Sequence, residues 1–138
     1  MKILILCTAN SCRSQMAAGF LTSFAPKAEV FSAGTHPGPR VDPLAIAVMR
    51  EDMIDLSGQK PRNVSDFLTA SFDLVLTVCD SAKEQCPVFA GQVKQRMHIG
   101  FEDPAAFQGS DEDRLEVYRS IRDEIKQQIF ILYKNLIH

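Results

Sequence analysis

The segment from Cys7 to Ser14 has the residue types and spacing of a loop that binds a tetrahedral oxyanion. It reads Cys-Thr-Ala-Asn-Ser-Cys-Arg-Ser and lies between a short apolar run and an amphipathic stretch. Backbone N–H groups of a tight loop, together with a helix N-terminus, form a cradle for an oxyanion. The loop residues expected to line this cradle are Thr8, Ala9, Asn10, Ser11, Cys12 and Arg13.

Within this loop the thiolate of Cys7 is the expected nucleophile. Arg13 supplies a planar fork that can hold two oxygens of the anion. The same positive field is expected to lower the pKa of Cys7. The Ser14 hydroxyl can donate a hydrogen bond to the sulfur, and Asn10 suits a loop position with positive φ.

Other phosphate-binding loops do not fit this segment. A dinucleotide fingerprint needs G-x-G-x-x-G, but residues 7–19 contain only Gly19, and the triphosphate pattern G-x4-G-K-[ST] is absent as well. A buried structural cysteine at a strand end is the remaining alternative. Arg13 and Ser14 at their spacing from Cys7 favour thiolate chemistry instead.

Two further cysteines, Cys79 and Cys86, stand seven residues apart after an apolar run. A disulfide framework suits small secreted chains, and the spacings C-x4-C and C-x6-C do not favour zinc. We therefore expect reactive thiols and no metal site. If the segment between them is helical, a rise of about 1.5 Å per residue separates them by roughly 10 Å. A disulfide needs Cα atoms within about 7 Å, so this segment must unwind for the pair to bond.

Strands and helices are expected to alternate along the chain. Apolar runs predict strands over 2–6, 28–33, 72–78 and 93–99; helical spacing predicts helices over 14–24, 44–53 and from 110 onward, with a short one near 63–65. The fold class is α/β: a three-layer, doubly wound, four-stranded parallel sheet with helices on both faces. Such a sheet brings Cys7, Cys79 and the loop around Asp103 to one edge.

The composition indicates one domain over residues 1–138. The formal net charge of -2 gives no reason to expect nucleic acid or a membrane as partner. No apolar run approaches the roughly 20 residues of a membrane span, and the opening run is too short for a signal peptide. We expect a cytoplasmic monomer, with the charges of 114–126 on a solvated helix face.

Several motifs together resemble a known family. The loop C-T-A-N-S-C-R-S-Q-M-A is similar to the active-site loop of thioredoxin-coupled arsenate reductases, which share the low-molecular-weight protein tyrosine phosphatase fold. The resemblance continues in S-A-G at 32–34, V-C-x6-C-P at 78–87, G-F-E-D-P at 100–104 and R-D-E-I-K at 122–126. It implies arsenate as substrate and thioredoxin or another dithiol as electron donor. We expect no cofactor, although some members of the family bind potassium.

The resemblance also implies roles for individual residues. Cys7 attacks arsenate, Cys79 attacks Cys7, and Cys86 then takes over the disulfide by thiol exchange. Asp103 serves as the general acid. Cys12 has no required step in this relay.

The sequence departs from the phosphatase pattern at several positions. Gln15 stands where phosphatases have proline, and Ala105 and Ala106 follow Asp103-Pro104 where they have an aromatic residue, although Phe107 is a possible substitute. Ala18 occupies the position of an acidic potassium ligand, which puts a potassium ion in doubt. The alternatives are a phosphatase that uses Cys7, Arg13 and Asp103, and a non-catalytic redox-sensing or phosphate-binding module.

Overall fold

The apolar run at the N-terminus forms an inner strand of a four-stranded parallel sheet. In this computed structural model, which describes residues 1–136, the order of the strands is β2-β1-β3-β4. Their bounds are β1 (Lys2–Cys7), β2 (Glu29–Gly34), β3 (Phe72–Thr77) and β4 (Val93–His98). Ile3 to Leu6 of β1 are fully buried, as expected for a strand covered on both faces.

Helices connect the strands in the expected alternation. They are α1 (Arg13–Phe24), α2 (Pro43–Glu51), α3 (Asp80–Gln85) and α4 (Asp111–Leu136), with 3-10 helices η1 (Val64–Phe67) and η2 (Pro104–Ala106). Asp42 caps α2, since its Oδ1 accepts the Leu44 N–H at 2.9 Å, and Ser110 Oγ accepts the Asp113 N–H at the start of α4. Local capping chemistry therefore sets where these helices begin.

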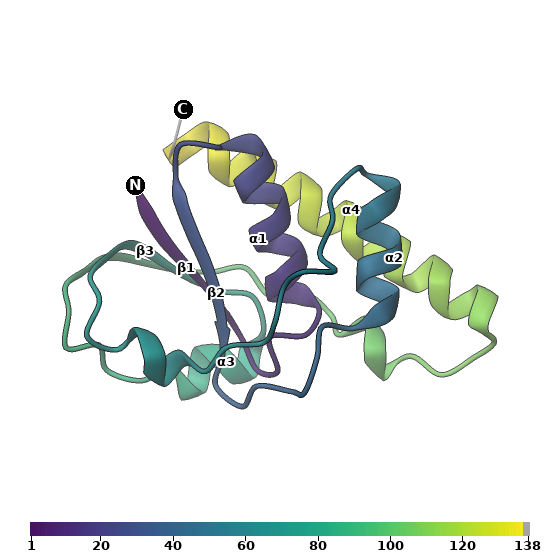
Figure 1. Cartoon of the computed structure of the whole chain (residues 1–138), viewed down its shortest axis with the longest axis horizontal. Coiled ribbons are helices and arrows are strands. Elements are labelled where there is room, and N and C mark those ends of the chain that lie inside the picture. The colour runs from purple at the N-terminus through teal and green to yellow at the C-terminus, as the bar shows by residue number, and fades with distance from the viewer. Residues whose placement is uncertain (137–138) are drawn as a thin grey trace.

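The helices cover both faces of the sheet (Figure 1). Helices α1 and α4 pack together on one face, and α2 packs on α4. Right-handed crossovers place η1 and α3 on the other face. The carboxyl ends of the strands meet at one edge, where the loop after β1 and the start of α3 lie side by side. The predicted α/β class and three-layer arrangement are confirmed.

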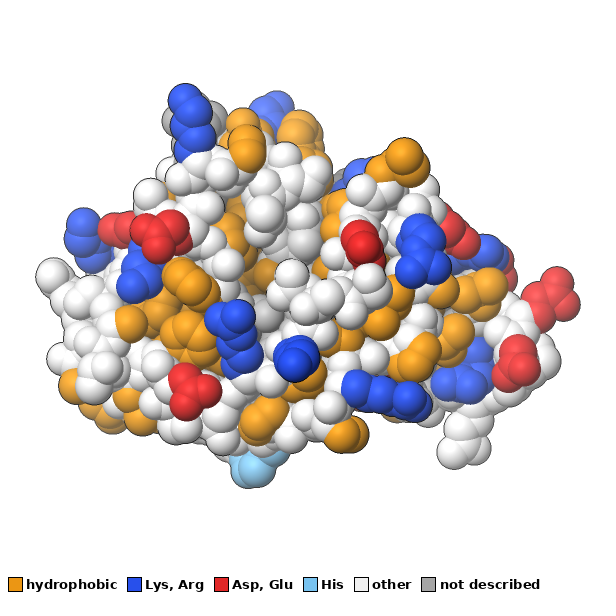
Figure 2. Space-filling view, in the orientation of Figure 1, with side chains coloured by type: hydrophobic (Ala, Val, Ile, Leu, Met, Phe, Trp, Pro, Cys, Tyr) orange, Lys and Arg blue, Asp and Glu red, His pale blue; other side chains and the backbone are white. Residues whose placement is uncertain are grey.

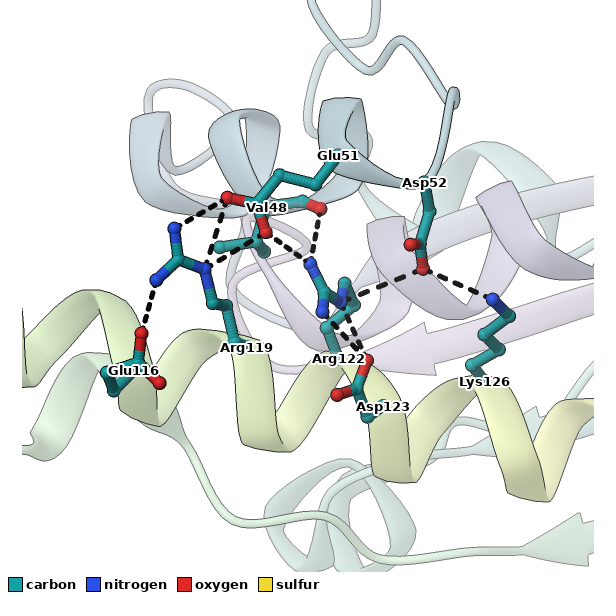
Figure 3. A network of polar contacts seen from close by, with 8 residues as sticks. All are labelled: Val48, Glu51, Asp52, Glu116, Arg119, Arg122, Asp123 and Lys126. Atoms are coloured by element: carbon teal, nitrogen blue, oxygen red, sulfur yellow. Dashed lines mark hydrogen bonds and ion pairs between the residues drawn. The ribbon is translucent and has the colours of Figure 1, made fainter.

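An ion-pair network joins α2 to α4 (Figure 3). Arg119 and Arg122 of α4 both bind the Glu51 carboxylate, at 2.8 and 2.6 Å, and Arg122 also donates to the Val48 carbonyl at 2.9 Å. Arg122 is only 8% exposed. The prediction of a solvated face over 114–126 is therefore wrong for Arg122, because the apolar stripe of α4 turns this side chain toward α2.

Charges of both signs are mixed on the face of the molecule drawn in Figure 2. Figure 2 shows lysine and arginine side chains scattered among acidic, apolar and uncharged ones, so no continuous basic surface forms on the face drawn. Within residues 1–136, no helix is both long enough and apolar enough to cross a membrane.

Candidate active site

The carbonyl groups of residues 7–12 all accept hydrogen bonds from other segments or from the start of α1. The donors are Thr35 N to Cys7 O (3.1 Å), His36 N to Thr8 O (2.9 Å), Gly38 N to Ala9 O (2.9 Å), Gln15 Nε2 to Asn10 O (3.1 Å), Asp42 N to Ser11 O (2.8 Å) and Met16 N to Cys12 O (2.9 Å). Among residues 1–136 the N–H groups of 9–13 have no hydrogen-bond acceptor. With its carbonyls bonded elsewhere, the loop leaves a run of N–H donors for an anion.

Asn10 holds the loop in this conformation. Its φ of 53° is the positive value that the sequence predicts. The buried side chain donates from Nδ2 to Ser14 Oγ at 2.8 Å and accepts the Arg62 N–H on Oδ1 at 2.9 Å. The amide of Gln15 also donates to Oδ1, at 3.2 Å. These contacts connect the loop to α1 and to the segment before η1.

Gly34 allows β2 to approach the loop closely. A Cβ at this position would lie 2.4 Å from the Thr8 carbonyl oxygen, closer than any real side chain tolerates. The next residue, Thr35, begins the series of N–H donors to the loop. The absence of a side chain at Gly34 is therefore what permits this backbone pairing.

Arg13 and Asp103 lie next to each other at the edge of the sheet. Arg13 donates from Nη1 to the Phe101 carbonyl at 3.1 Å, and its Nη2 lies 3.8 Å from Asp103 Oδ2. The Asp103 side chain also accepts the Ala105 N–H at 3.0 Å and remains exposed to solvent. The guanidinium and the carboxyl group thus border the same loop from two segments about ninety residues apart, as predicted.

The thiols of Cys7 and Cys79 lie near enough for each to influence the other's pKa. The Thr8 hydroxyl lies 3.3 Å from the Cys79 sulfur. Both cysteines are buried. The thiol of the loop and the second thiol therefore share one small, largely dry environment.

The two thiols of this pair differ in pKa. The neighbouring Cys7 thiol, helped by the Thr8 hydroxyl and the Ala82 N–H, lowers the pKa of Cys79 to about 5. The Cys79 side chain, with burial, raises the pKa of Cys7, against the lowering effect of Arg13 and the Thr8 N–H. The predicted lowering of the Cys7 pKa is thus wrong for this resting pair, because the neighbouring sulfur outweighs the loop.

The remaining predicted residues of the loop have structural partners. Ser14 is buried and accepts the Asn10 amide, and no hydrogen bond joins it to Cys7 within residues 1–136, so its predicted donation to the sulfur stays a prediction. Burial and the carboxylate of Asp42 raise the pKa of Cys12, which keeps that thiol protonated.

Cys86 lies at the far end of α3 from Cys79. The segment between them is helical, so a separation of roughly 10 Å applies and the two thiols cannot bond in this conformation. Cys86 is half-buried, and Arg96 Nη1 lies 3.7 Å from its sulfur. All four thiols are free.

The residues beside Ala18 do not fit a potassium ion. Ala18 brings no oxygen ligand, and the cavity of about 290 Å³ that it borders is also lined by Lys60 and Arg62. The positive charges of Lys60 and Arg62 would repel a potassium ion, although the Asp55 carboxylate also borders the cavity. No cluster of three or more His, Cys, Asp or Glu side chains suits a metal within the described residues.

Similar proteins match this chain over nearly its whole length. Residues 2–138 match the family of low molecular weight phosphotyrosine protein phosphatases. An arsenate reductase of Halalkalibacterium halodurans is 41% identical over 128 residues, which cover 92% of this chain and 91% of the relative. Another arsenate reductase, from Bacillus subtilis, is 38% identical over 128 residues, again 92% and 91% of the two chains. A solved arsenate reductase in a phosphate-binding state superposes with a TM-score of 0.81 at 33% identity, over 98% of each chain.

The fold and the cysteine-containing loop define an enzyme of the low-molecular-weight phosphatase class. The chain belongs to the low molecular weight phosphotyrosine protein phosphatase family. Within that family its curated relatives are arsenate reductases, which confirms the resemblance seen in the sequence.

Sequence reasoning missed several residues that support the site. Thr8 was expected to contribute only its N–H, yet its hydroxyl contacts Cys79. Gly34 and the donors at 35–42 lie in a strand end and a loop whose proximity to the site depends on strand pairing. The S-A-G motif at 32–34 was the available signal for Gly34. No sequence signal pointed to Arg96, which lies beside the Cys86 sulfur.

Proposed function

We propose that this protein is an arsenate reductase that converts arsenate to arsenite by a relay of three thiols, Cys7, Cys79 and Cys86. The position of the Cys79 thiol beside Cys7 carries this proposal. A second thiol next to the nucleophile, with a lowered pKa, serves no purpose in ester hydrolysis but suits thiol exchange.

In the first step, the loop N–H groups and Arg13 hold arsenate. Cys7 gives its proton to the Cys79 thiolate and attacks arsenic, and an As–O bond breaks. Asp103, beside Arg13, donates the proton with which that oxygen leaves as water. The product is a Cys7–arsenic adduct.

In the second step, Cys79 attacks the sulfur of Cys7. The S–As bond breaks and its electron pair stays on arsenic, which is reduced from As(V) to As(III). The Cys79 proton passes to an oxygen of the departing arsenite, and a Cys7–Cys79 disulfide remains. The Thr8 hydroxyl lies beside the attacking sulfur.

In the third step, Cys86 attacks Cys79 as a thiolate and releases the Cys7 thiolate. Helix α3 must unwind for this step, since it separates the two thiols. The Cys79–Cys86 disulfide is then reduced by a dithiol protein, for which we propose thioredoxin. The protein would act as a cytoplasmic monomer.

A phosphatase that uses Cys7, Arg13 and Asp103 is the second candidate, because the same loop can hold phosphate. The surroundings of Asp103 favour it less. Ala105 and Ala106 are small and exposed, and the Phe107 ring packs over Gly109, where an added Cβ would lie 2.9 Å from it. An aromatic platform for a phosphotyrosine ring is therefore not formed by these residues.

One assay separates these candidates from a non-catalytic redox module. We would follow arsenate-dependent oxidation of thioredoxin by the wild type and by Cys7→Ser, Cys79→Ser and Cys86→Ser. All three variants should lose multiple turnover. Hydrolysis of p-nitrophenyl phosphate, if present, should survive in Cys79→Ser and Cys86→Ser, which shows that the loop is intact. Multiple turnover of arsenate by Cys79→Ser would overturn the proposal.

A further inference from the structure

Strand β4 contacts both ends of helix α3. His98 Nε2 lies 2.9 Å from Oδ1 of Asp80, the first residue of α3. Arg96 Nη1 lies 3.7 Å from the sulfur of Cys86, the residue at which α3 ends. Arg96 and His98 are two positions apart on the strand, so their side chains project from the same face. One strand thus holds the helix that separates the two relay thiols.

The His98 ring is oriented from two sides. The Asp80 carboxylate only accepts hydrogen bonds, so His98 Nε2 carries the donated proton. On the other side, His98 Nδ1 lies 2.8 Å from Thr77 Oγ1, which can donate to it. A Cβ on Gly100 would lie 3.2 Å from both His98 Nε2 and Asp80 Oδ1. The absence of a side chain at Gly100 therefore leaves room for the contact between His98 and Asp80.

Arg96 is also held in position. Its guanidinium lies over the buried Phe89 ring, 5.6 Å from the centroid, and Phe89 packs edge-to-face on Phe72 of β3. Within residues 1–136 Arg96 has no carboxylate partner. Its polar contact is the Cys86 sulfur, at the end of α3.

Helix α3 depends on such contacts. With six residues it is far shorter than the roughly 12–15 residues at which isolated helices become marginally stable. Its loss would bring Cys79 and Cys86 within reach of each other. If they bonded before arsenate reacted, Cys79 would be unavailable to attack Cys7.

We propose that His98 and Arg96 are positioning residues that keep α3 helical in the reduced enzyme, so that Cys79 stays free to attack Cys7. This inference rests on the proposed relay. It assigns to β4 the order of the two exchanges: Cys79 attacks Cys7 first, and Cys86 gains access only when α3 opens.

The test measures disulfide formation without arsenate. In a Cys7→Ser, Cys12→Ser background, Cys79 and Cys86 are the remaining thiols, and diamide accepts their two electrons and two protons to become the hydrazine. Asp80→Ala and His98→Ala should each speed formation of the Cys79–Cys86 disulfide by about two- to fivefold, the effect of losing one solvent-exposed hydrogen bond. The double variant should be no faster than either single one, because both remove the same contact.

Lys94→Gln is the matched control. Lys94 lies on the same strand and pairs with Asp73 of β3 at 3.1 Å, with no contact to α3. This variant should form the disulfide at the same rate as the Cys7→Ser, Cys12→Ser parent. Amide hydrogen exchange of residues 80–86 should quicken in Asp80→Ala and His98→Ala and stay unchanged in Lys94→Gln.

The proposal would be overturned if both single variants formed the disulfide at the rate of the Cys7→Ser, Cys12→Ser parent. Additive effects in the double variant, or unchanged hydrogen exchange of residues 80–86, would also overturn it. Asp80 is exposed, so its truncation tests the contact even if His98→Ala fails to fold. Because no arsenate is used, these outcomes are independent of whether the protein reduces arsenate.

Discussion

The hydroxyl of Thr8 lies 3.3 Å from the sulfur of Cys79, and this contact joins the oxyanion loop to the second thiol across 71 positions of sequence. It places a proton donor beside a sulfur whose pKa is lowered to about 5. In the proposed relay, the loop would therefore both bind the anion and prepare the thiol that attacks after the anion has reacted.

Replacing Thr8 by valine should raise the pKa of Cys79, since the Thr8 hydroxyl is one of the causes that lower it. Less thiolate would then exist at acidic pH. We expect alkylation of Cys79 by iodoacetamide to fall severalfold near pH 5–6 and to change little at pH 8. Mass spectrometry of the alkylated peptide measures this. Thr22→Val, at an exposed position of α1, is the control, and an equal loss there would contradict the assignment.

Replacing Arg96 by glutamine should slow alkylation of Cys86. Burial raises the pKa of Cys86, and Arg96 is the charge that opposes this rise. Without it the pKa rises further, and at pH 7–8 the thiolate fraction should fall by about threefold to tenfold. The rate of Cys86 alkylation, read from the peptide, should be unchanged in Lys94→Gln. If Arg96→Gln behaved like Lys94→Gln, the guanidinium would have no effect on the thiol.

Gly34→Ala should disrupt the loop. The new Cβ would lie 2.4 Å from the Thr8 carbonyl, and that oxygen is backbone, which cannot move aside cheaply. We expect the free energy of unfolding to fall by about 1–3 kcal/mol and phosphate or arsenate binding to weaken. Urea unfolding and calorimetric titration measure the two effects. Gly58→Ala is the matched control, because a Cβ there meets nothing within 4 Å. If Gly34→Ala and Gly58→Ala were equally stable and bound the anion equally well, the close approach of Gly34 to the Thr8 carbonyl would be refuted.

The pairing of Glu51 with Arg119 and Arg122 should make stability depend on acid pH. These hydrogen bonds lower the pKa of Glu51 from 4.5 to about 2. The stabilisation is therefore fully present above about pH 4.5 and is lost as pH falls toward 2. Because the Glu51 side chain is 39% exposed, Glu51→Gln should lower the free energy of unfolding by only about 1 kcal/mol at pH 7.

Thermal melts from pH 3 to 7 test this dependence. The difference in Tm between the wild type and Glu51→Gln should shrink as the pH falls below 4.5. Glu124→Gln changes a carboxylate on α4 that has no ion pair among residues 1–136, and its Tm should match the wild type throughout. A Glu51→Gln difference that stays constant down to pH 3 would argue against the lowered pKa.

The sequence by itself determined the order and type of the main elements. The apolar run at 2–6 favoured a buried strand, and the side chains of Asp42 and Ser110 cap α2 and α4 through contacts within four residues. The loop at 7–14 was equally local, and the positive φ of Asn10 followed from the residue type. Such features depend on neighbours in sequence and can be derived from them.

Only the tertiary structure decided that the thiols of Cys7 and Cys79 influence each other's pKa. The loop and Arg13 favour a thiolate at Cys7, but strand pairing between β1 and β3 brings Cys79 near it, and that neighbour raises the pKa of Cys7. The donors at 35–42, the close approach of Gly34 and the contacts of β4 with α3 have the same origin. Each joins segments that are distant in sequence, so it exists only once the sheet has set which strand ends meet.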